Sequence, residues 1–255
     1  MFEQPRFIEN SFSVSFNRQL DIRRKSNDIE DMLKSKLAGH YSQPQIFPIP
    51  DELDPQVPRL IFGSTHGYSQ IVISQMSISL NVRYSPDYQL DIAMGQKYLK
   101  ERIPVLFEII KSFKEIRPFF CGLTTRVDLY APTAEDDQII KHLSNLFLKE
   151  AEFDKIHDVE LKVTNIINDQ YFNNMVIKNF REWRLMEPPQ EMPRLSQKKS
   201  SIKGIQIIGD FNDRYSFNEK QDYFSGLGII ADIIDKAFIE IHAMIKTCQE
   251  ADNEK

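Results

Sequence analysis

The side chains in this sequence that could do chemistry are small polar and charged residues on the expected outer face of a β-sheet. Apolar and polar residues alternate through PFFCGLTTRVDLY at 118–130 and again through 77–84, which predicts strands with one buried face and one open face. The outward positions are Ser79, Asn81 and Arg83 on one strand and Thr124, Arg126 and Asp128 on the other. A plainly solvated face usually carries Lys and Glu, whereas small neutral polar residues suit a ligand or a partner protein. The two arginines would recognise an anionic group.

Motifs that bind metals, bind phosphate or build a nucleophile are missing from the sequence. The five histidines fall in five separate expected elements, and neither HExxH, CxxC, GxSxG nor a phosphate-binding glycine loop occurs. Asp210 and Asp213 lie in GDFND at a strand end and could hold a metal, but a turn that bonds its own backbone is the favoured interpretation. We therefore expect no cofactor and no metal.

Composition places the chain among folded globular proteins that do not span a membrane. It has 255 residues, 41% hydrophobic residues and a net charge of −5 that is spread along its length. No window approaches the length of a membrane helix, and the N-terminus does not resemble a signal peptide. Cys121 and Cys248 are expected in the core, so a cytoplasmic location is expected. The basic stretches at 23–25 and 198–199 are short and carry no interleaved aromatic residues, which argues against nucleic-acid binding.

The order of expected elements repeats. The first half reads strand 7–16, helix 26–38, a proline-rich loop 41–57, strands 59–64, 68–74 and 77–84, and helix 91–113. The second half reads strand 118–130, a helix capped by Thr133, a hairpin of 159–167 and 171–183, a flexible loop 186–201, strand 202–211 and helix 222–249. Pro104 should kink or divide the first long helix.

The final helix carries an apolar stripe at three-four spacing. The stripe consists of Leu227, Ile230, Ile234, Ala237, Ile241, Met244 and Cys248. Its width suits packing on a sheet better than a free coiled coil, although a homodimer seam is the alternative.

These observations predict an α+β protein of two β-α-β-β-β-α units, 1–116 and 117–255. Each unit would have an antiparallel sheet backed by a long helix on one face, with an open polar face opposite. The two sheets would lie side by side or merge into one sheet and one domain.

The chain resembles a family of uncharacterised, sporadically distributed bacterial proteins of about this length. The likeness is carried by Pro5 and Glu9 before an alternating strand, GLTTRVDLY at 122–130, TNII at 164–167 and the closing helix. The resemblance implies a patchy bacterial distribution in mobile or defence-associated loci and supplies no catalytic residue. The order of elements in each half also looks like the duplicated half of TATA-binding-protein-like folds.

Three functions are compatible with these residues. The first is a non-catalytic intracellular binding or regulatory protein that uses the open face to hold a protein partner or a small ligand. The second is an enzyme whose site is assembled from scattered residues, including Arg83, Arg126 and Asp128. The third is nucleic-acid binding across the sheet. A deep pocket that unites those three residues with a histidine would favour the enzyme.

Overall fold

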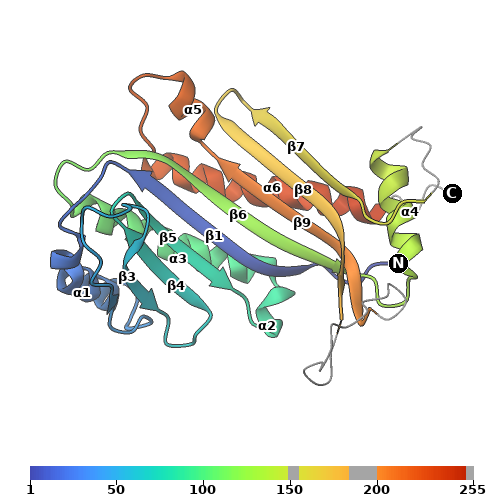
Figure 1. Cartoon of the computed structure of the whole chain (residues 1–255), viewed down its shortest axis with the longest axis horizontal. Coiled ribbons are helices and arrows are strands. Elements are labelled where there is room, and N and C mark those ends of the chain that lie inside the picture. The colour runs from blue at the N-terminus through green and yellow to red at the C-terminus, as the bar shows by residue number, and fades with distance from the viewer. Residues whose placement is uncertain (149–154, 184–199, 251–255) are drawn as a thin grey trace.

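The structure, a computed structural model, describes residues 1–148, 155–183 and 200–250. Within them, nine strands form one continuous antiparallel sheet and six α-helices accompany it, so the predicted α+β class is confirmed (Figure 1). The two sheets of the prediction are thus a single sheet. Of the predicted loop 186–201, residues 186–199 lie outside the described residues.

The strands follow the predicted alternation closely. They are β1 (Arg6–Phe16), β2 (Gln45–Ile46), β3 (Pro58–Gly63), β4 (Ser69–Ser74), β5 (Ser77–Arg83), β6 (Pro118–Tyr130), β7 (Glu160–Ile167), β8 (Tyr171–Glu182) and β9 (Ile202–Asn212). The bounds of β6 are those predicted, β3 is shifted by one residue at both ends, and each other predicted strand differs by one residue at one end. Strand β2 was not predicted, because its two residues lie within the proline-rich loop 41–57.

Strands β1 and β6 form the centre of the sheet. The strand order is β2-β3-β4-β5-β1-β6-β9-β8-β7. Moving outward, β1 is followed by β5, β4 and β3, and β6 is followed by β9, β8 and β7. Every pairing between neighbouring strands is antiparallel.

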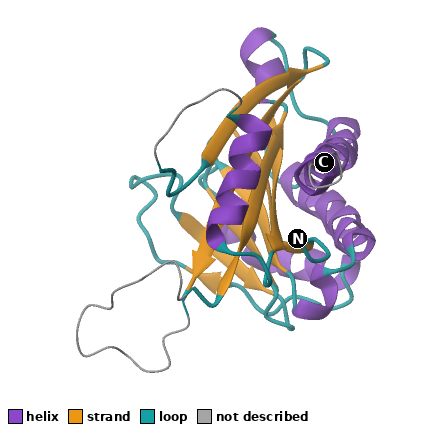
Figure 2. Cartoon of the chain, turned by 90° about the vertical axis from the view of Figure 1, so that its right-hand side faces the viewer, coloured by secondary structure: helices purple, strands orange, loops and turns teal. Residues whose placement is uncertain are grey.

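Two long helices cover one face of this sheet (Figure 2). Helix α3 (Ile92–Lys111) packs on β1 and β5, and helix α6 (Leu227–Glu250) packs on β6 and β9. The two helices also contact each other, where Gln96 Nε2 donates to Asp235 Oδ1 at 2.7 Å. The layer between helices and sheet is apolar, and residues such as Phe12, Leu123 and Ile234 are at most 2% exposed there.

The other helices are α1 (Ser26–Lys36), α2 (Pro86–Gln89), α4 (Asp136–Phe147) and α5 (Arg214–Glu219). Neither α2 nor α5 was predicted, because four and six residues are too few to show a helical period. Helix α3 runs through Pro104 as one helix, so the predicted division did not occur. Proline removes a single backbone hydrogen bond, and packing of the buried stripe on the sheet offsets that loss.

Two predicted helix starts were wrong. Helix α4 is capped by Glu135, not Thr133, because Glu135 and Gln138 form a reciprocal capping box in which Gln138 Oε1 accepts from the Glu135 N–H at 2.7 Å. Helix α6 begins at Leu227 instead of residue 222. Leu227 is therefore 44% exposed at the helix end, whereas the stripe from Ile230 onward is buried except for Met244, which is partly buried against the core.

Close contact between β6 and β9 depends on a glycine. A Cβ atom built at Gly204 would lie 2.0 Å from the Leu129 carbonyl oxygen, far inside contact distance. Any larger residue would force the two strands apart. Gly204 therefore allows β9 to continue alongside the central strand.

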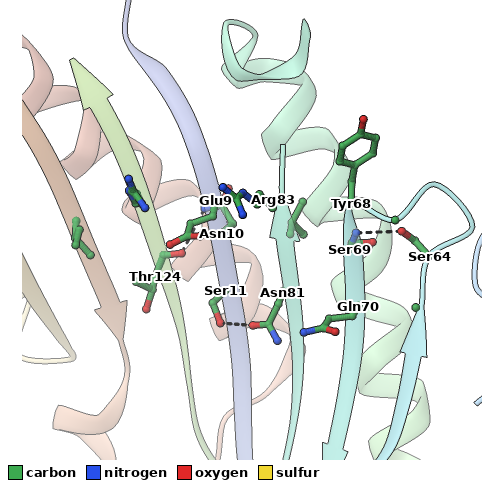
Figure 3. Close-up of a pocket in the computed structure, with 15 residues that line it drawn as sticks. Glu9, Asn10, Ser11, Ser64, Tyr68, Ser69, Gln70, Asn81, Arg83 and Thr124 are labelled. Atoms are coloured by element: carbon green, nitrogen blue, oxygen red, sulfur yellow. Dashed lines mark hydrogen bonds between the residues drawn. The ribbon is translucent and has the colours of Figure 1, made fainter. Parts of the chain in front are cut away.

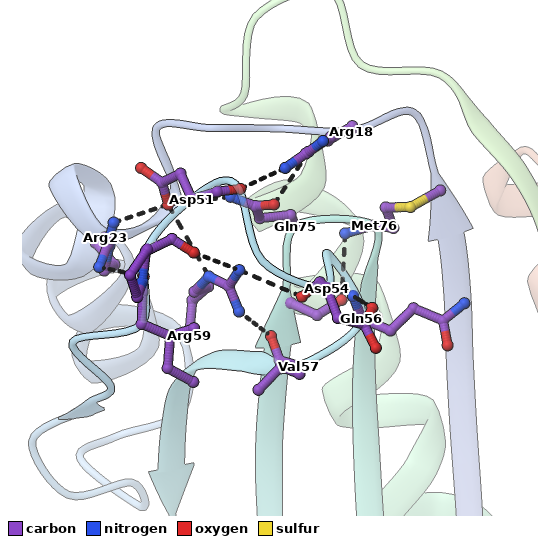
Figure 4. A network of polar contacts seen from close by, with 12 residues as sticks. Arg18, Arg23, Asp51, Asp54, Gln56, Val57, Arg59, Gln75 and Met76 are labelled. Carbon is purple, nitrogen blue, oxygen red and sulfur yellow. Dashed lines mark hydrogen bonds and ion pairs between the residues drawn. The ribbon is translucent and has the colours of Figure 1, made fainter.

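A network of arginines fixes the proline-rich loop at one edge of the sheet (Figure 4). Arg59 of β3 is 1% exposed, and its guanidinium donates to the carbonyl oxygens of Val57 at 2.7 Å and Asp54 at 3.3 Å. Asp51 accepts from Arg23 Nη2 at 2.7 Å and from Gln75 Nε2 at 3.0 Å. A buried guanidinium is costly unless it is hydrogen-bonded, so the contacts of the two Nη atoms of Arg59 hold the loop against β3.

Candidate binding site on the open sheet face

The sheet face opposite α3 and α6 is the face toward the viewer in Figure 1, and its middle is hollowed (Figure 3). The hollow has a volume of about 540 Å³ and is lined by residues of β1, β3, β4, β5, β6 and β9 and of the β3–β4 turn. Of the six predicted face residues, Asn81, Arg83, Thr124 and Arg126 line it. The structure thus brings together four side chains that come from two strands on opposite sides of β1.

A row of alternating charge crosses the hollow. The antiparallel register places Glu9 of β1 opposite Arg83 of β5 on one side and opposite Arg126 of β6 on the other. Glu9 and Arg83 are exposed, and Arg126 is half-buried. Burial lowers the pKa of Arg126, but the hydrogen bonds and charge of Asp128 and the charge of Glu9 outweigh it, so its pKa is raised. The row is therefore positive, negative, positive.

A second row, two residues along each strand, is neutral and polar. Gln70, Asn81, Ser11 and Thr124 lie opposite one another across β4, β5, β1 and β6. Ser11 Oγ donates to Asn81 Oδ1 at 2.7 Å, which orients the Asn81 amide. Beyond β6 the row continues through the acidic Asp210 on β9 and the neutral Asn174 and Thr164 on β8 and β7. The open face thus carries a band of hydrogen-bonding groups from β4 to β7.

Two predicted site residues lie elsewhere. Asp128 is on the open face but 1% exposed, because Arg126 and Gln206 cover it. Arg126 donates to its carboxylate through Nε at 3.2 Å and Nη2 at 3.0 Å, and Gln206 Nε2 donates at 3.1 Å. Asp128 therefore holds Arg126 in position without lining the hollow. Ser79 lies one row away, between Val72 and Ser13, and does not line the hollow either.

The predicted turn at Asp213 does bond its own backbone, because Asn212 Oδ1 accepts from the Arg214 N–H at 3.3 Å, but Asp213 also has partners that were not predicted. Asp213 is fully buried, and its carboxylate accepts from the Cys121 N–H at 2.6 Å, from Tyr223 Oη at 2.7 Å and from the Ser225 hydroxyl. It therefore ties β6 to the segment before α6, in addition to bonding its own turn. Burial raises the pKa of Asp213 even though these hydrogen bonds lower it. Among the described residues, no group of three His, Cys, Asp or Glu side chains is close enough to hold a metal ion.

The lining residues that the sequence pattern did not predict include Glu9, Gln70 and Tyr68. Glu9 continues the same period of two as Ser11 and Ser13, so one further step along the strand would have included it. Tyr68 directly follows the Gly67 turn and is 52% exposed. Its place at the hollow depends on how far β4 reaches beside β5, which the sequence pattern does not define.

The residues around the hollow can bind a ligand or a partner segment, but they include no evident reacting group. Arg83 and Arg126 offer guanidinium donors for a carboxylate or phosphate, and the amides and hydroxyls offer directional hydrogen bonds. The union of Arg83, Arg126, Asp128 and a histidine that would favour an enzyme is not formed in the hollow. Its lining residues include no histidine, and Asp128 is enclosed beside it.

Searches against protein-family models and against curated proteins found no match for this chain. The resemblance to the sporadically distributed bacterial family rests on the sequence features given above. No helix in the described ranges combines the length and apolar character needed to cross a lipid bilayer.

Proposed function

We propose that this protein is a non-catalytic binding or regulatory protein that holds an acidic segment of a protein partner in the hollow of its open sheet face. The observation that carries the proposal is the gathering of Asn81, Arg83, Thr124 and Arg126 around one hollow, on the sheet face opposite the two long helices of the described residues. These residues offer donors and acceptors and no nucleophile with an adjacent base.

The two arginines would contribute in different ways. Asp128 holds the Nε and Nη2 atoms of Arg126, so this side chain loses little conformational entropy on binding. Arg83 is exposed, and no hydrogen bond or ion pair of its side chain occurs within the described part of the chain. It is free to pair with an incoming carboxylate. Glu9 between them disfavours a partner with an unbroken acidic run, which adds specificity.

Affinity capture with matched charge reversals tests this proposal. Arg83→Glu changes the hollow, whereas Lys162→Glu makes the same change at an exposed position on β7, outside the hollow. A partner captured by the parent should be retained by Lys162→Glu and weakened at least about 30-fold by Arg83→Glu, as for a hot-spot residue worth 2 kcal/mol or more. Equal retention by both variants, or repeated recovery of the protein alone, would contradict the proposal.

Nucleic-acid binding gives a different result in a simple assay. Basic side chains that contact phosphates produce retention on heparin that falls steeply with salt. With a net charge of −5, we expect the protein to pass through heparin even at low salt. Salt-dependent retention that Arg83→Glu abolishes would replace a protein partner with a nucleic acid.

We also propose that the chain consists of two β-α-β-β-β-α units, 1–116 and 117–255. The strand order supports this. With the two-residue β2 left aside, each unit would begin with a central strand, β1 or β6, whose outward neighbours are its fourth, third and second strands, and would end with a long helix. An experimental structure tests it by superposition. Half a turn about an axis between β1 and β6 should place α3 on α6, and a mismatch of the helices would argue against two units.

The biological setting follows from the resemblance and is also a proposal. We infer a cytoplasmic bacterial protein encoded in a defence or mobile-element locus. Two buried free thiols suit a reducing compartment. Sequencing of neighbouring genes tests the locus, and a fixed neighbour encoding an unrelated housekeeping enzyme would count against it.

A further inference from the structure

A second pocket adjoins the hollow. It has a volume of about 290 Å³, and four tyrosines and one histidine form most of its wall. These residues are Tyr68, Tyr84, Tyr88, Tyr98 and His66. The pocket shares Ser64, Tyr68 and Val82 with the hollow, so the two cavities meet at the start of β4. We call it the tyrosine pocket.

The floor of the tyrosine pocket is built from rings whose hydroxyl groups are already satisfied. Tyr84 is 6% exposed, and its hydroxyl donates to the Gly95 carbonyl oxygen at 3.3 Å. The Tyr98 hydroxyl lies 2.6 Å from Ser69 Oγ. Because these polar groups are bonded, the floor offers chiefly apolar ring surface to an occupant.

The rim of the pocket is aromatic and exposed. Tyr68 and Tyr88 are 52% and 45% exposed, although aromatic rings of this size usually bury most of their surface. Tyrosine and arginine are enriched among the residues that dominate binding energy at protein interfaces. Strands that line the two cavities are also hydrogen-bonded to each other, because the Arg83 N–H donates to the Tyr68 carbonyl oxygen at 2.8 Å.

A cationic occupant is disfavoured by a buried charge behind the pocket. The guanidinium carbon of Arg102 lies 3.4 Å from the centroid of the Tyr98 ring, and Arg102 is 6% exposed. The ring already faces one cation, so a second cation on its other side would be repelled. A neutral apolar or aromatic group would bury ring surface without that repulsion.

We propose that the tyrosine pocket receives one apolar or aromatic side chain of the partner protein, whose nearby acidic residue pairs with Arg83 in the hollow. This inference rests on the proposed function and specifies the partner as an extended segment that combines an acidic residue with an apolar anchor. The pocket lies at the lower limit of small-molecule sites, which favours a single side chain over a whole ligand. The lining residues that it shares with the hollow place the anchor near the charged row.

Selection from a random peptide library displayed on phage, with the full chain immobilised, tests the inference. We expect enriched peptides to carry Asp or Glu within a few residues of Phe, Tyr, Trp, Leu or Ile. Affinities of a selected peptide are then measured by calorimetry for the parent, Arg83→Glu, the Tyr68→Ala/Tyr88→Ala double variant and Ile239→Ala. Ile239 is a matched control, because it is 63% exposed on α6, away from both cavities.

The expected result is a loss of affinity of tenfold or more for Arg83→Glu and for the double variant, with no change for Ile239→Ala. Replacing the peptide's anchor by alanine should cost the parent the same factor and the double variant nothing further, which shows that anchor and pocket interact directly. The alanine peptide tests the pocket on the parent protein even if the double variant does not fold.

The outcomes separate the two proposals. If Arg83→Glu weakens binding while the double variant and the alanine peptide bind as tightly as the parent pair, the pocket inference fails and the proposed function stands. If no peptide is enriched, or if Arg83→Glu binds all selected peptides unchanged, both fail.

Discussion

Replacement of Ile234 by aspartate should unfold the protein. Ile234 is 2% exposed in the layer between α6 and the sheet. Truncation of a buried isoleucine to alanine costs about 2–5 kcal/mol, and an unpaired carboxylate in an apolar layer adds several more. The sum is comparable with the roughly 5–15 kcal/mol by which whole domains are stable.

The same helix supplies the control for this experiment. Ile239 lies five residues further on and is 63% exposed, so Ile239→Asp should cost less than about 1 kcal/mol, mainly through helix propensity. Urea unfolding followed by circular dichroism measures both variants, with Ile234→Ala as an intermediate change. If Ile234→Asp folds and is as stable as Ile239→Asp, α6 is not a core helix and its assigned packing on the sheet is wrong.

Three further perturbations test separate features. Gly204→Ala should destabilise the fold by about 1–3 kcal/mol or more through its backbone clash, whereas Gly226→Ala, with nothing within 4 Å of its new methyl group, should leave the melting temperature unchanged. Equal melting temperatures for the two variants would refute the close strand contact. Because burial raises the pKa of Asp213, the folded protein holds that proton more tightly than the unfolded chain, so the contribution of Asp213 to stability falls as pH rises above about 4. Asp213→Asn should remove this part of the pH dependence of the free energy of unfolding, measured by urea unfolding between pH 4 and 7. The same pH dependence in parent and variant would contradict this. Burial raises the pKa of Cys121 and raises that of Cys248 to about 12, so neither thiol should react with Ellman's reagent at pH 8 until the chain is unfolded, and rapid labelling of the native protein would show that a thiol is accessible.

Most elements could be predicted because a strand or helix with one buried face has apolar residues at regular spacing. That spacing is two residues in a strand and three or four residues in a helix, so it can be read from neighbouring positions in the sequence. The alternation through β6 gave both its bounds and its buried side. The caps were harder to predict, because Thr133 and Glu135 are both acceptable and only the position of Gln138 decides between them. Burial of the α6 stripe was predicted correctly from Ile230 onward except at the partly buried Met244, whereas Leu227 is exposed because the helix starts there.

The binding site was only partly predictable, because strand order determines it. The pattern placed Arg83 and Arg126 on outward positions, but their approach requires β1 to lie between β5 and β6, which no local feature states. For the same reason, Glu9 lies between two positively charged arginines. Asp128 is buried by Gln206, which lies 78 residues later in the chain. Such long-range partners are set by register, and a single sequence carries little information about register.

The central place of β1 has a consequence for how the protein is made. Strand β1 is synthesised before both of its neighbours: Ser11 bonds Asn81, 70 residues later, and Asn10 bonds Thr125, 115 residues later. Closing such long loops costs entropy before any contact is gained, so we expect joining of β1 to β6 to limit the rate of refolding. During translation, one edge of β1 has no strand beside it until the second half emerges, and an open edge can pair with a neighbouring nascent chain. The strand that unites the finished sheet is therefore the one most exposed to misassembly while the chain is incomplete.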